Sequence, residues 1–362
     1  MVMINLPRPL AYILIMAVVV LYAATWRTAR FDRADFLAFY SSARLWQSGQ
    51  NPYDREAECR FQATIRPDLC MPNPHPPVLL PLFALISSND YRASFRRWSV
   101  LLLFVLAGCV WVAYQFSGSL VSALFSVLFY PIFISITQGN VSPFILLSVL
   151  LWIMLLKEKR DIWAGVALSV SVIKPQLALL LAVPMLFSNR KAFWGFCLGA
   201  TALVLFSFAL VGIEGFKSLV ETLIAMLSDK EVGTDPAKMF SVTGLLARAG
   251  LSRLLAWPVF IGAIIGLSVL WQRRFNLHTQ MFGIVVSLFA VPHLFMHDVS
   301  LVAIPLLLIR PAGPIIASCV LLVAESAGLG YTVLYLILGG LSGFYLTAET
   351  RRSRKKLGDH PV

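Results

Sequence analysis

The sequence predicts an all-helical protein that crosses a membrane many times. Of its 362 residues, 58% are hydrophobic and 13% are charged, whereas soluble domains carry about 25% charged residues. The mean hydropathy is +0.78, and apolar runs near the ~20 residues of a membrane span recur along the chain. These observations exclude a water-soluble globule, which needs more polar surface, and a disordered chain, which needs fewer apolar residues and more charge.

Roughly thirteen apolar runs mark the predicted helices in chain order. Several are shorter than the ~20 residues of a straight span, so we interpret them as broken or half-spanning helices whose backbone lines a protein cavity. The runs lie at about 9–26, 77–88, 97–116, 119–137, 141–156, 162–174, 176–188, 193–212, 254–272, 281–296, 299–309, 313–327 and 329–347.

The basic residues predict the orientation of these helices. Lys and Arg collect in short gaps between apolar runs and in the tail 351–362, as expected for cytoplasmic segments. Arg8 and that tail place both chain ends in the cytoplasm, which requires an even number of crossings, about twelve. Either 77–88 or 119–137 fails to cross, and the sequence leaves both open. The net charge of +12 is thereby explained without nucleic acid, and anionic membrane lipids are the expected partners of the tail.

Two long segments are expected on the outer side of a single transmembrane domain, residues 1–350. They are the first outer loop, 27–76, and the second outer loop, about 213–252. Within the first loop, aromatic residues recur at three- and four-residue spacing over 35–47. This spacing predicts an amphipathic helix that lies in the membrane interface.

Polar residues at membrane depth are the candidate functional residues, because burying them is costly. Asp35 follows the first apolar run and heads the predicted interfacial helix, where the helix dipole favours a carboxylate. It is a helix cap, an ion-pair partner of Arg33 or Arg44, or a catalytic carboxylate. Lys174 ends another apolar run, and it either snorkels to the interface or binds a lipid phosphate.

Two further polar groups interrupt the apolar pattern. The first, residues 138–140 (Gln-Gly-Asn), is either a plain turn or a turn whose side chains hydrogen-bond a sugar. The second is His293, His297 and Asp298, and two histidines with one carboxylate are too few ligands for a metal site. We therefore expect no metal and assign this group to hydrogen bonding or charge neutralisation near a phosphate.

The sequence contains no cofactor-binding motif. It has no phosphate-binding loop, dinucleotide fingerprint or nucleophile elbow. Three cysteines lie inside apolar runs and are interpreted as small hydrophobic residues. Cys59 and Cys70 share the first outer loop, and they can pair if that loop faces an oxidising compartment. The sequence leaves this pairing open.

Several short motifs follow one another over residues 25–310. They are Asp35-Phe36-Leu37-Ala38-Phe39-Tyr40-Ser41-Ser42-Ala43 with Gly49, Pro52 and Tyr53; Pro76-Pro77-Val78-Leu79-Leu80-Pro81-Leu82; Gln138-Gly139-Asn140-Val141; Ala164-Gly165 with Ile173-Lys174-Pro175; Ser241-Val242-Thr243-Gly244; and His297 before a Leu-rich run with Pro305. In this order the motifs resemble the family 87 glycosyltransferases. That family has the GT-C membrane fold and uses polyprenyl-phosphate-linked sugars, typically mannose. The chain departs from the family pattern at His75, where Tyr is usual, and in the order of polar residues at 138–140.

The resemblance implies a role for each candidate residue. Asp35 matches the acidic residue of the first outer loop, which acts as general base in GT-C enzymes. Lys174, His297 and Arg44 are then expected to bind the donor phosphate. The expected sugar or acceptor contacts are Tyr40, His75, Gln138, Asn140 and Asp298.

The resemblance implies an enzyme that transfers a hexose from a polyprenyl-phosphate sugar to a lipid or glycan acceptor. Mannose is the expected sugar, and the reaction is expected to invert its configuration. The enzyme is a multi-pass protein of the bacterial inner (plasma) membrane with its site facing the periplasm or the outside, and it needs no cofactor besides its lipid-linked donor. Three alternatives stay open: a lipid or glycan transporter or flippase, an enzyme like an O-antigen ligase or polymerase, and a non-catalytic family member.

Overall fold

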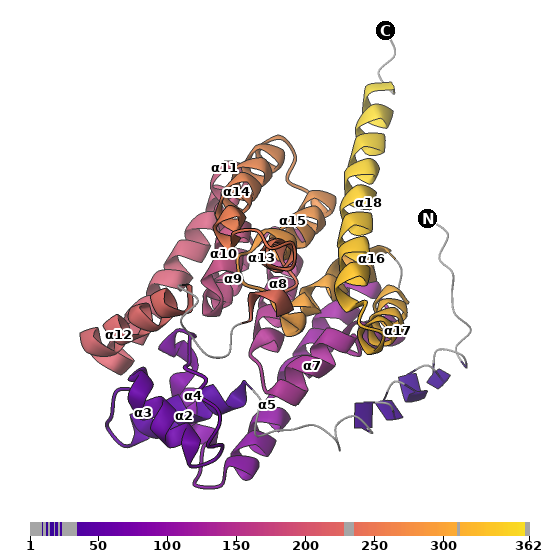
Figure 1. The fold of residues 1–362 in the computed structure, drawn as a ribbon. Coiled ribbons are helices and arrows are strands. Elements are labelled where there is room, and N and C mark those ends of the chain that lie inside the picture. Colours follow the sequence, from indigo (N-terminus) through magenta and orange to yellow (C-terminus); the bar gives the residue numbers. More distant parts are fainter. Residues whose placement is uncertain are drawn as a thin grey trace.

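The computed structural model describes residues 35–227, 235–309 and 312–358, together with scattered positions between 9 and 23. Within these residues every regular element is a helix (Figure 1). Only scattered positions of the first predicted run, 9–26, are among them. Four of the described helices are long and apolar enough to cross a membrane, which confirms the prediction of a helical membrane protein. They are Tyr91–Ser117, Arg190–Ala225, Arg253–Arg273 and Gly330–Thr350.

The expected number of about twelve crossings stays a prediction. Helices α6 (Leu120–Val127) and α7 (Tyr130–Gln138) meet at 53° and form a fifth candidate span if they are counted together. Other apolar runs form helices of 10–17 residues, too short for a straight span of ~20. Two of them, Asp161–Ile173 and Pro175–Ser188, are separated by Lys174, which stands between the 3-10 helix η3 (Val170–Ile173) and α10 (Pro175–Ala182).

The helices follow one another along the chain in two groups, the first of which we call the α2–α4 module. The α2–α4 module comprises α2 (Phe36–Gln47), α3 (Arg55–Ala63), η2 (Pro77–Leu79) and α4 (Leu80–Ile86). Beyond it lie α5 (Tyr91–Ser117), α8 (Ser142–Lys157), α9 (Asp161–Ser169), α11 (Met185–Ser188), α12 (Arg190–Leu227), η4 (Pro236–Lys238), α13 (Val242–Arg248), η5 (Arg253–Leu255), α14 (Ala256–Arg273), α15 (Leu277–Ala290), η6 (Met296–Val302), α16 (Ala303–Ile309), α17 (Gly313–Ser326) and α18 (Gly330–Gly358).

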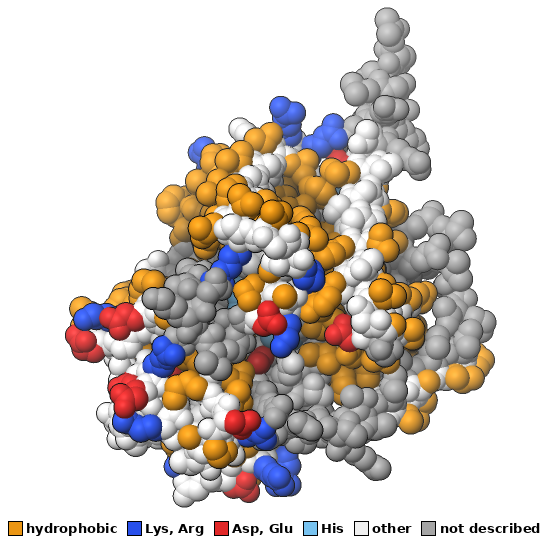
Figure 2. All heavy atoms as spheres, in the orientation of Figure 1, with side chains coloured by type: hydrophobic (Ala, Val, Ile, Leu, Met, Phe, Trp, Pro, Cys, Tyr) orange, Lys and Arg blue, Asp and Glu red, His pale blue; other side chains and the backbone are white. Residues whose placement is uncertain are grey.

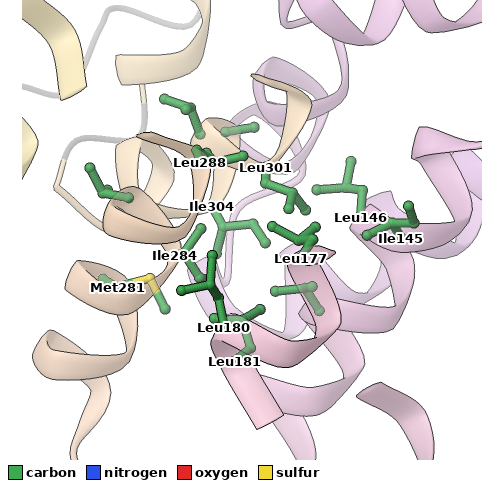
Figure 3. Close-up of a cluster of buried hydrophobic side chains, with 14 of the residues drawn as sticks. Ile145, Leu146, Leu177, Leu180, Leu181, Met281, Ile284, Leu288, Leu301 and Ile304 are labelled. Carbon is green, nitrogen blue, oxygen red and sulfur yellow. The ribbon is translucent and has the colours of Figure 1, made fainter. Parts of the chain in front are cut away.

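The largest apolar core lies where α8, α10, α15 and the η6–α16 pair meet (Figure 3). Leu146, Leu177, Ile284, Leu301 and Ile304 are buried there and point toward one another. Interiors of this kind are close-packed, so the helix ends around them have little freedom to shift. The core therefore fixes the positions of the polar segments that join these short helices.

Helix α2 is buried on nearly all sides, so its aromatic side chains pack inside the protein and not at lipid headgroups, while its location in the membrane interface stays a prediction. Nine of its twelve residues are buried. Phe36 packs against Phe83 of α4 and Trp98 of α5, with ring centroids 6.3 and 6.2 Å apart. Ser41 and Ser42 are covered by the polar side chains of Glu58 and Gln62 on α3. Tertiary partners thus bury both faces of this helix.

Helix α12 does not end where the second outer loop was expected to begin. Gly212 has φ 65° and ψ −172° and kinks the helix, and the chain beyond it remains helical. The indole of Trp46 donates a hydrogen bond to the carbonyl oxygen of Leu210 at 3.0 Å, and Asn51 Nδ2 donates to Ser218 Oγ at 2.9 Å. The kinked helix therefore packs against the α2–α4 module, beside which it lies in Figure 1.

The surface differs between the two parts of the molecule. In the view of Figure 2, charged side chains gather around the α2–α4 module, where Arg60 and Glu56 form an exposed ion pair at 2.8 Å. The long helices instead expose large apolar side chains, among them Trp194, Leu198 and Phe104. So much exposed apolar surface is typical of a protein embedded in lipid.

Candidate active site

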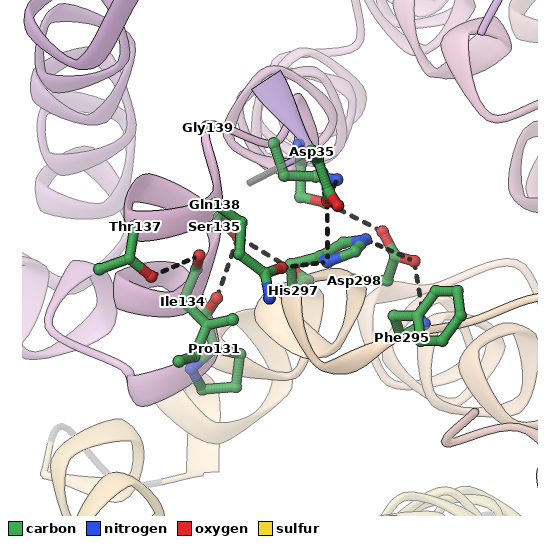
Figure 4. Close-up of polar contacts among 12 residues, drawn as sticks. Asp35, Pro131, Ile134, Ser135, Thr137, Gln138, Gly139, Phe295, His297 and Asp298 are labelled. Atoms are coloured by element: carbon green, nitrogen blue, oxygen red, sulfur yellow. Dashed lines mark hydrogen bonds and ion pairs between the residues drawn. The ribbon is translucent and has the colours of Figure 1, made fainter. Parts of the chain in front are cut away.

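Segments that are far apart in the sequence bring polar side chains to one place, which we call the polar cluster (Figure 4). Asp35 stands directly before α2, and residues 138–142 form the turn from α7 into α8. Lys174 lies at the break between η3 and α10, and His297 and Asp298 belong to η6. Hydrogen bonds and ion pairs connect all four segments.

The carboxylate of Asp35 points into the polar cluster and does not cap its own helix. Its Oδ2 accepts a hydrogen bond from Asn140 Nδ2 at 2.7 Å and lies 3.7 Å from Nδ1 of His297. No backbone N–H of α2 binds this side chain. The helix-cap alternative is thereby excluded, while Arg33 lies outside the described residues. With 28% of its surface exposed, the side chain remains accessible to a ligand.

The segment 138–140 is a turn that also supplies side chains to the cluster. Gly139 has φ 65°, and a Cβ added there would lie 2.7 Å from the Cβ of Phe36, so this turn requires glycine. The indole of Trp98 donates to the carbonyl oxygen of Gly139 at 2.7 Å. Asn140 Oδ1 accepts from the backbone N–H and the hydroxyl of Ser142 at 2.9 and 2.7 Å. The amide of Asn140 is therefore held at both ends.

Lys174 is buried in an ion pair and does not snorkel to the interface. Its backbone is non-helical, and Pro175 begins the next helix, a position that proline tolerates because its missing N–H is not needed there. The ammonium forms a buried ion pair with Asp298 Oδ1 and lies 3.4 Å from Ser142 Oγ. Burying charged groups is costly unless they are paired and hydrogen-bonded, and the ion pair with the Ser142 contact meets this requirement.

His297 lies between the two carboxylates. Its Nδ1 is 3.7 Å from Asp35 Oδ2, and its Nε2 is 3.5 Å from Asp298 Oδ2. Gln138 Oε1 lies 3.1 Å from Nδ1, and the hydroxyl of Ser135 donates to the carbonyl oxygen of His297 at 3.2 Å. The imidazole is thus held at Nδ1 and lies between Asp35 and the buried ion pair.

Two more histidines border the cluster. Burial and the nearby Lys174 ammonium lower the pKa of His75 to about 3. Burial lowers the pKa of His293 to about 4, although the Asp298 carboxylate opposes that shift. Both rings are therefore neutral at pH 7, and each offers one hydrogen-bond donor and one acceptor. Tyr53 donates to the carbonyl oxygen of His75 at 2.8 Å and fixes its backbone.

Tyr40 and Arg44 lie outside the polar cluster. The hydroxyl of Tyr40 donates to the carbonyl oxygen of Ser88 at 2.6 Å. Arg44 donates to Asn89 Oδ1 at 2.6 Å on the exposed side of the module, so it is no ion-pair partner of Asp35. A helix turns about 100° and rises 1.5 Å per residue. Tyr40 therefore points to a different side of α2 than Asp35, and Arg44 lies more than two turns beyond Asp35.

Ser142 belongs to the cluster, although sequence reasoning did not select it. Its Oγ lies 2.7 Å from Asn140 Oδ1, 2.9 Å from Asp298 Oδ1 and 3.4 Å from Lys174 Nζ. In the sequence it precedes Pro143 at a helix start, where serine is common for local reasons. Only its position one residue beyond the polar turn could have pointed to this role.

A disulfide lies in the α2–α4 module, and the described residues form no metal-ligand group. Cys59 and Cys70 are joined in a disulfide, with their Cα atoms 4.9 Å apart. This bond ties α3 to the segment that leads to His75. In the part of the chain that the structure describes, no three His, Cys, Asp or Glu side chains are arranged to hold a metal ion.

The fold and the polar cluster together define a helical membrane protein with a carboxylate, an imidazole and an ammonium at one site. Residues 74–305 match the model of glycosyltransferase family 87, which is more than half of the chain. The protein belongs to this family and is a glycosyltransferase. The matched segment contains Lys174 and His297, whereas Asp35 precedes it. No curated protein and no solved structure matches the chain.

Proposed function

We propose that the protein transfers a hexose, with mannose as the expected sugar, from a polyprenyl-phosphate donor to a lipid or glycan acceptor. The reaction takes place at the extracytoplasmic face of a bacterial plasma membrane and inverts the anomeric carbon. The lipid-linked donor is the only cosubstrate, and no cofactor takes part. The observation that carries the proposal is the Asp35 carboxylate, which is turned away from its helix toward Asn140 and His297.

Asp35 is the general base of this reaction. Its carboxylate takes the proton of the acceptor hydroxyl while that oxygen forms a bond to the anomeric carbon of the sugar. The bond from that carbon to the phosphate oxygen breaks in the same step, so configuration inverts and no second carboxylate nucleophile is required. The Asn140 amide, at 2.7 Å, orients the carboxylate for this proton transfer.

Lys174 stabilises the phosphate that leaves. An ammonium has three N–H donors, of which Asp298 and Ser142 engage two, which leaves the third for a phosphate oxygen. Asp298 therefore acts as a positioning residue that holds the ammonium. His297 adds a hydrogen bond to the same phosphate. Charges that are fixed before the reaction stabilise the developing negative charge without a reorganisation cost.

The membrane setting supports a lipid-linked donor. Large apolar side chains cover the long helices, whereas charged residues gather on the α2–α4 module. Asp35 opens this module, which supports a site at the level where a lipid tail and its polar head separate. The Cys59–Cys70 disulfide favours an oxidising compartment for the same module.

The base assignment is tested with Asp35→Asn in membranes supplied with radiolabelled polyprenyl-phosphate mannose. Transfer of label to the acceptor fraction should fall by about 10²-fold or more, because general-base catalysis contributes 10²–10⁴-fold. The matched control is Asp68→Asn, which changes an exposed carboxylate of the same loop that contacts Arg66. Full transfer by Asp35→Asn at normal expression would exclude the base role, and loss in both variants would point to a general defect.

The phosphate assignment is tested by removing the ammonium together with its partner. Lys174→Met combined with Asp298→Asn leaves no unpaired buried charge, so we expect the variant to fold. We expect a raised KM for the donor and a smaller change for the acceptor. An unchanged donor KM would remove Lys174 from the phosphate site. Donors that carry other hexoses, assayed in parallel, test the choice of mannose.

A further inference from the structure

A buried carboxyl group outside the polar cluster holds together the module that carries Asp35 and His75. Glu58, on α3, is fully buried. Its Oε1 lies 2.5 Å from Ser42 Oγ on α2, and its Oε2 accepts a hydrogen bond from the backbone N–H of Asn73 at 3.3 Å. One side chain therefore connects three segments of the module.

Gln62, one turn further along α3, makes the same kind of bridge. Its Nε2 donates to Ser41 Oγ at 2.9 Å and to the carbonyl oxygen of Met71 at 2.8 Å, and its Oε1 accepts from the Met71 N–H at 2.7 Å. Residues four apart lie on one face of a helix. Helix α3 thus uses Glu58 and Gln62 as a two-residue clamp between α2 and the segment 71–73.

The carboxyl group of Glu58 is buried between neutral hydrogen-bond donors. The Ser42 hydroxyl donates to Oε1, and the Asn73 N–H donates to Oε2. Burying a charge is costly unless it is paired, so burial between these neutral groups favours the protonated acid. The neighbouring Ser41 donates to the carbonyl oxygen of Ala38 at 2.9 Å and accepts from the amide of Gln62.

We infer that Glu58 is a positioning residue that holds the module closed in its protonated form, and that its ionisation at alkaline pH loosens the segments carrying Asp35 and His75. The link to His75 is short, because Asn73 Oδ1 accepts a hydrogen bond from the His75 N–H at 3.0 Å. On the other side, Ser42 stands two helical turns after Asp35 on the same face of α2. The role in activity rests on the proposed function, whereas the role in stability does not.

The surroundings of Glu58 favour the protonated form. Burial raises the pKa of this carboxyl group to about 8, and the nearby Asp54 carboxylate acts in the same direction. The hydrogen bonds from Ser42 and Asn73 oppose the shift. Tyr53, which faces Glu58 from the loop before α3, is buried, and burial raises the pKa of its phenol well above the usual range, so it adds no charge at neutral pH.

The raised pKa predicts how stability depends on pH. A folded-state pKa of about 8 lies above the ordinary value of 4.5. The stabilisation is therefore complete below pH 4.5, falls as pH rises because only the unfolded chain ionises, and is gone above about pH 8. A glutamine at this position is neutral and has nearly the same shape as the protonated acid, but it does not titrate.

The test compares Glu58→Gln with the wild-type protein by melting temperature, with the full chain in detergent from pH 5 to pH 9. The two should melt alike near pH 5, and the variant should melt several degrees higher at pH 8, after which the difference levels off. Glu56→Gln, on the exposed side of α3, should follow the wild-type profile. A Glu58→Gln profile parallel to wild type, or a lower melting temperature near pH 5, would overturn the inference.

Two further measurements separate stability from function. The infrared difference spectrum of wild type minus Glu58→Gln at pH 6.5 should contain the C=O band of a protonated carboxylic acid, and a carboxylate band instead would refute the protonated state. Sugar transfer by the wild type should decline reversibly above pH 8, with a weaker decline in the variant. An equal decline in both would refute the positioning role. If the wild type transfers no sugar at any pH, while the melting and infrared results are as expected, the proposed function alone is contradicted.

Discussion

Replacement of Asp298 by alanine measures how strongly the buried ion pair with Lys174 is coupled to stability. The two side chains are 7% and 8% exposed, so water cannot replace the lost carboxylate. Removing one partner of a buried pair costs about 3–5 kcal/mol, because the other charge is left uncompensated. The backbone N–H of Phe295 also loses its acceptor, which costs about 1 kcal/mol more. We expect a loss of roughly 4–6 kcal/mol in total, or on the order of 10 °C in melting temperature.

The assay is the melting temperature of the purified protein in detergent, followed by tryptophan fluorescence. Lys174→Met placed in the Asp298→Ala background removes the unpaired ammonium, so the double variant should recover most of the lost stability. The reasoning is refuted if Asp298→Ala melts within about 2 °C of wild type, a shift that corresponds to only ~1 kcal/mol. It is equally refuted if the double variant melts below the single one, because the penalty would then not come from the orphaned charge.

Two other substitutions have matched controls in the same structure. Gly139→Ala should destabilise the protein by on the order of 1–3 kcal/mol more than Gly49→Ala does. Both glycines have positive φ, but of the two only Gly139 has a neighbour, Phe36, within 4 Å of an added Cβ. Equal melting temperatures of the two variants would contradict the steric argument. Ser142→Ala should lower the transfer rate by about tenfold, because the aligned hydrogen bonds of Asn140 and Asp298 lose a partner. Ser148→Ala, on the same helix but bonded to Ala167, should retain activity, and equal rates in both serine variants would exclude the role of Ser142.

Local signals in the sequence were sufficient for the class of protein and for much of the site. Apolar runs and sparse charge predict membrane helices, because a segment in lipid needs apolar side chains and must satisfy its backbone hydrogen bonds internally. Asp35, Lys174 and His297 were selected for a similar reason, since a polar side chain at membrane depth is rare and costly. Their common location follows from contacts that the structure supplies, such as the 2.7 Å hydrogen bond from Asn140 to Asp35.

Partners that come from distant segments could not be read from local patterns. Helix α2 has the spacing of an interfacial helix, but α3 covers its polar face through Glu58 and Gln62. Tyr40 and Arg44 belong to the right motif, yet helical rotation and rise carry them away from the polar cluster.

The sequence alone determined that this protein is a helical membrane protein with rare polar residues along its apolar runs, because hydropathy and charge act residue by residue. Only the tertiary structure decided how those residues pair. Asn140 meets Asp35 across 105 positions of chain, and Lys174 meets Asp298 across 124. Such pairs form because a buried charge or amide must find a partner wherever packing brings one, and packing over that distance depends on the whole fold.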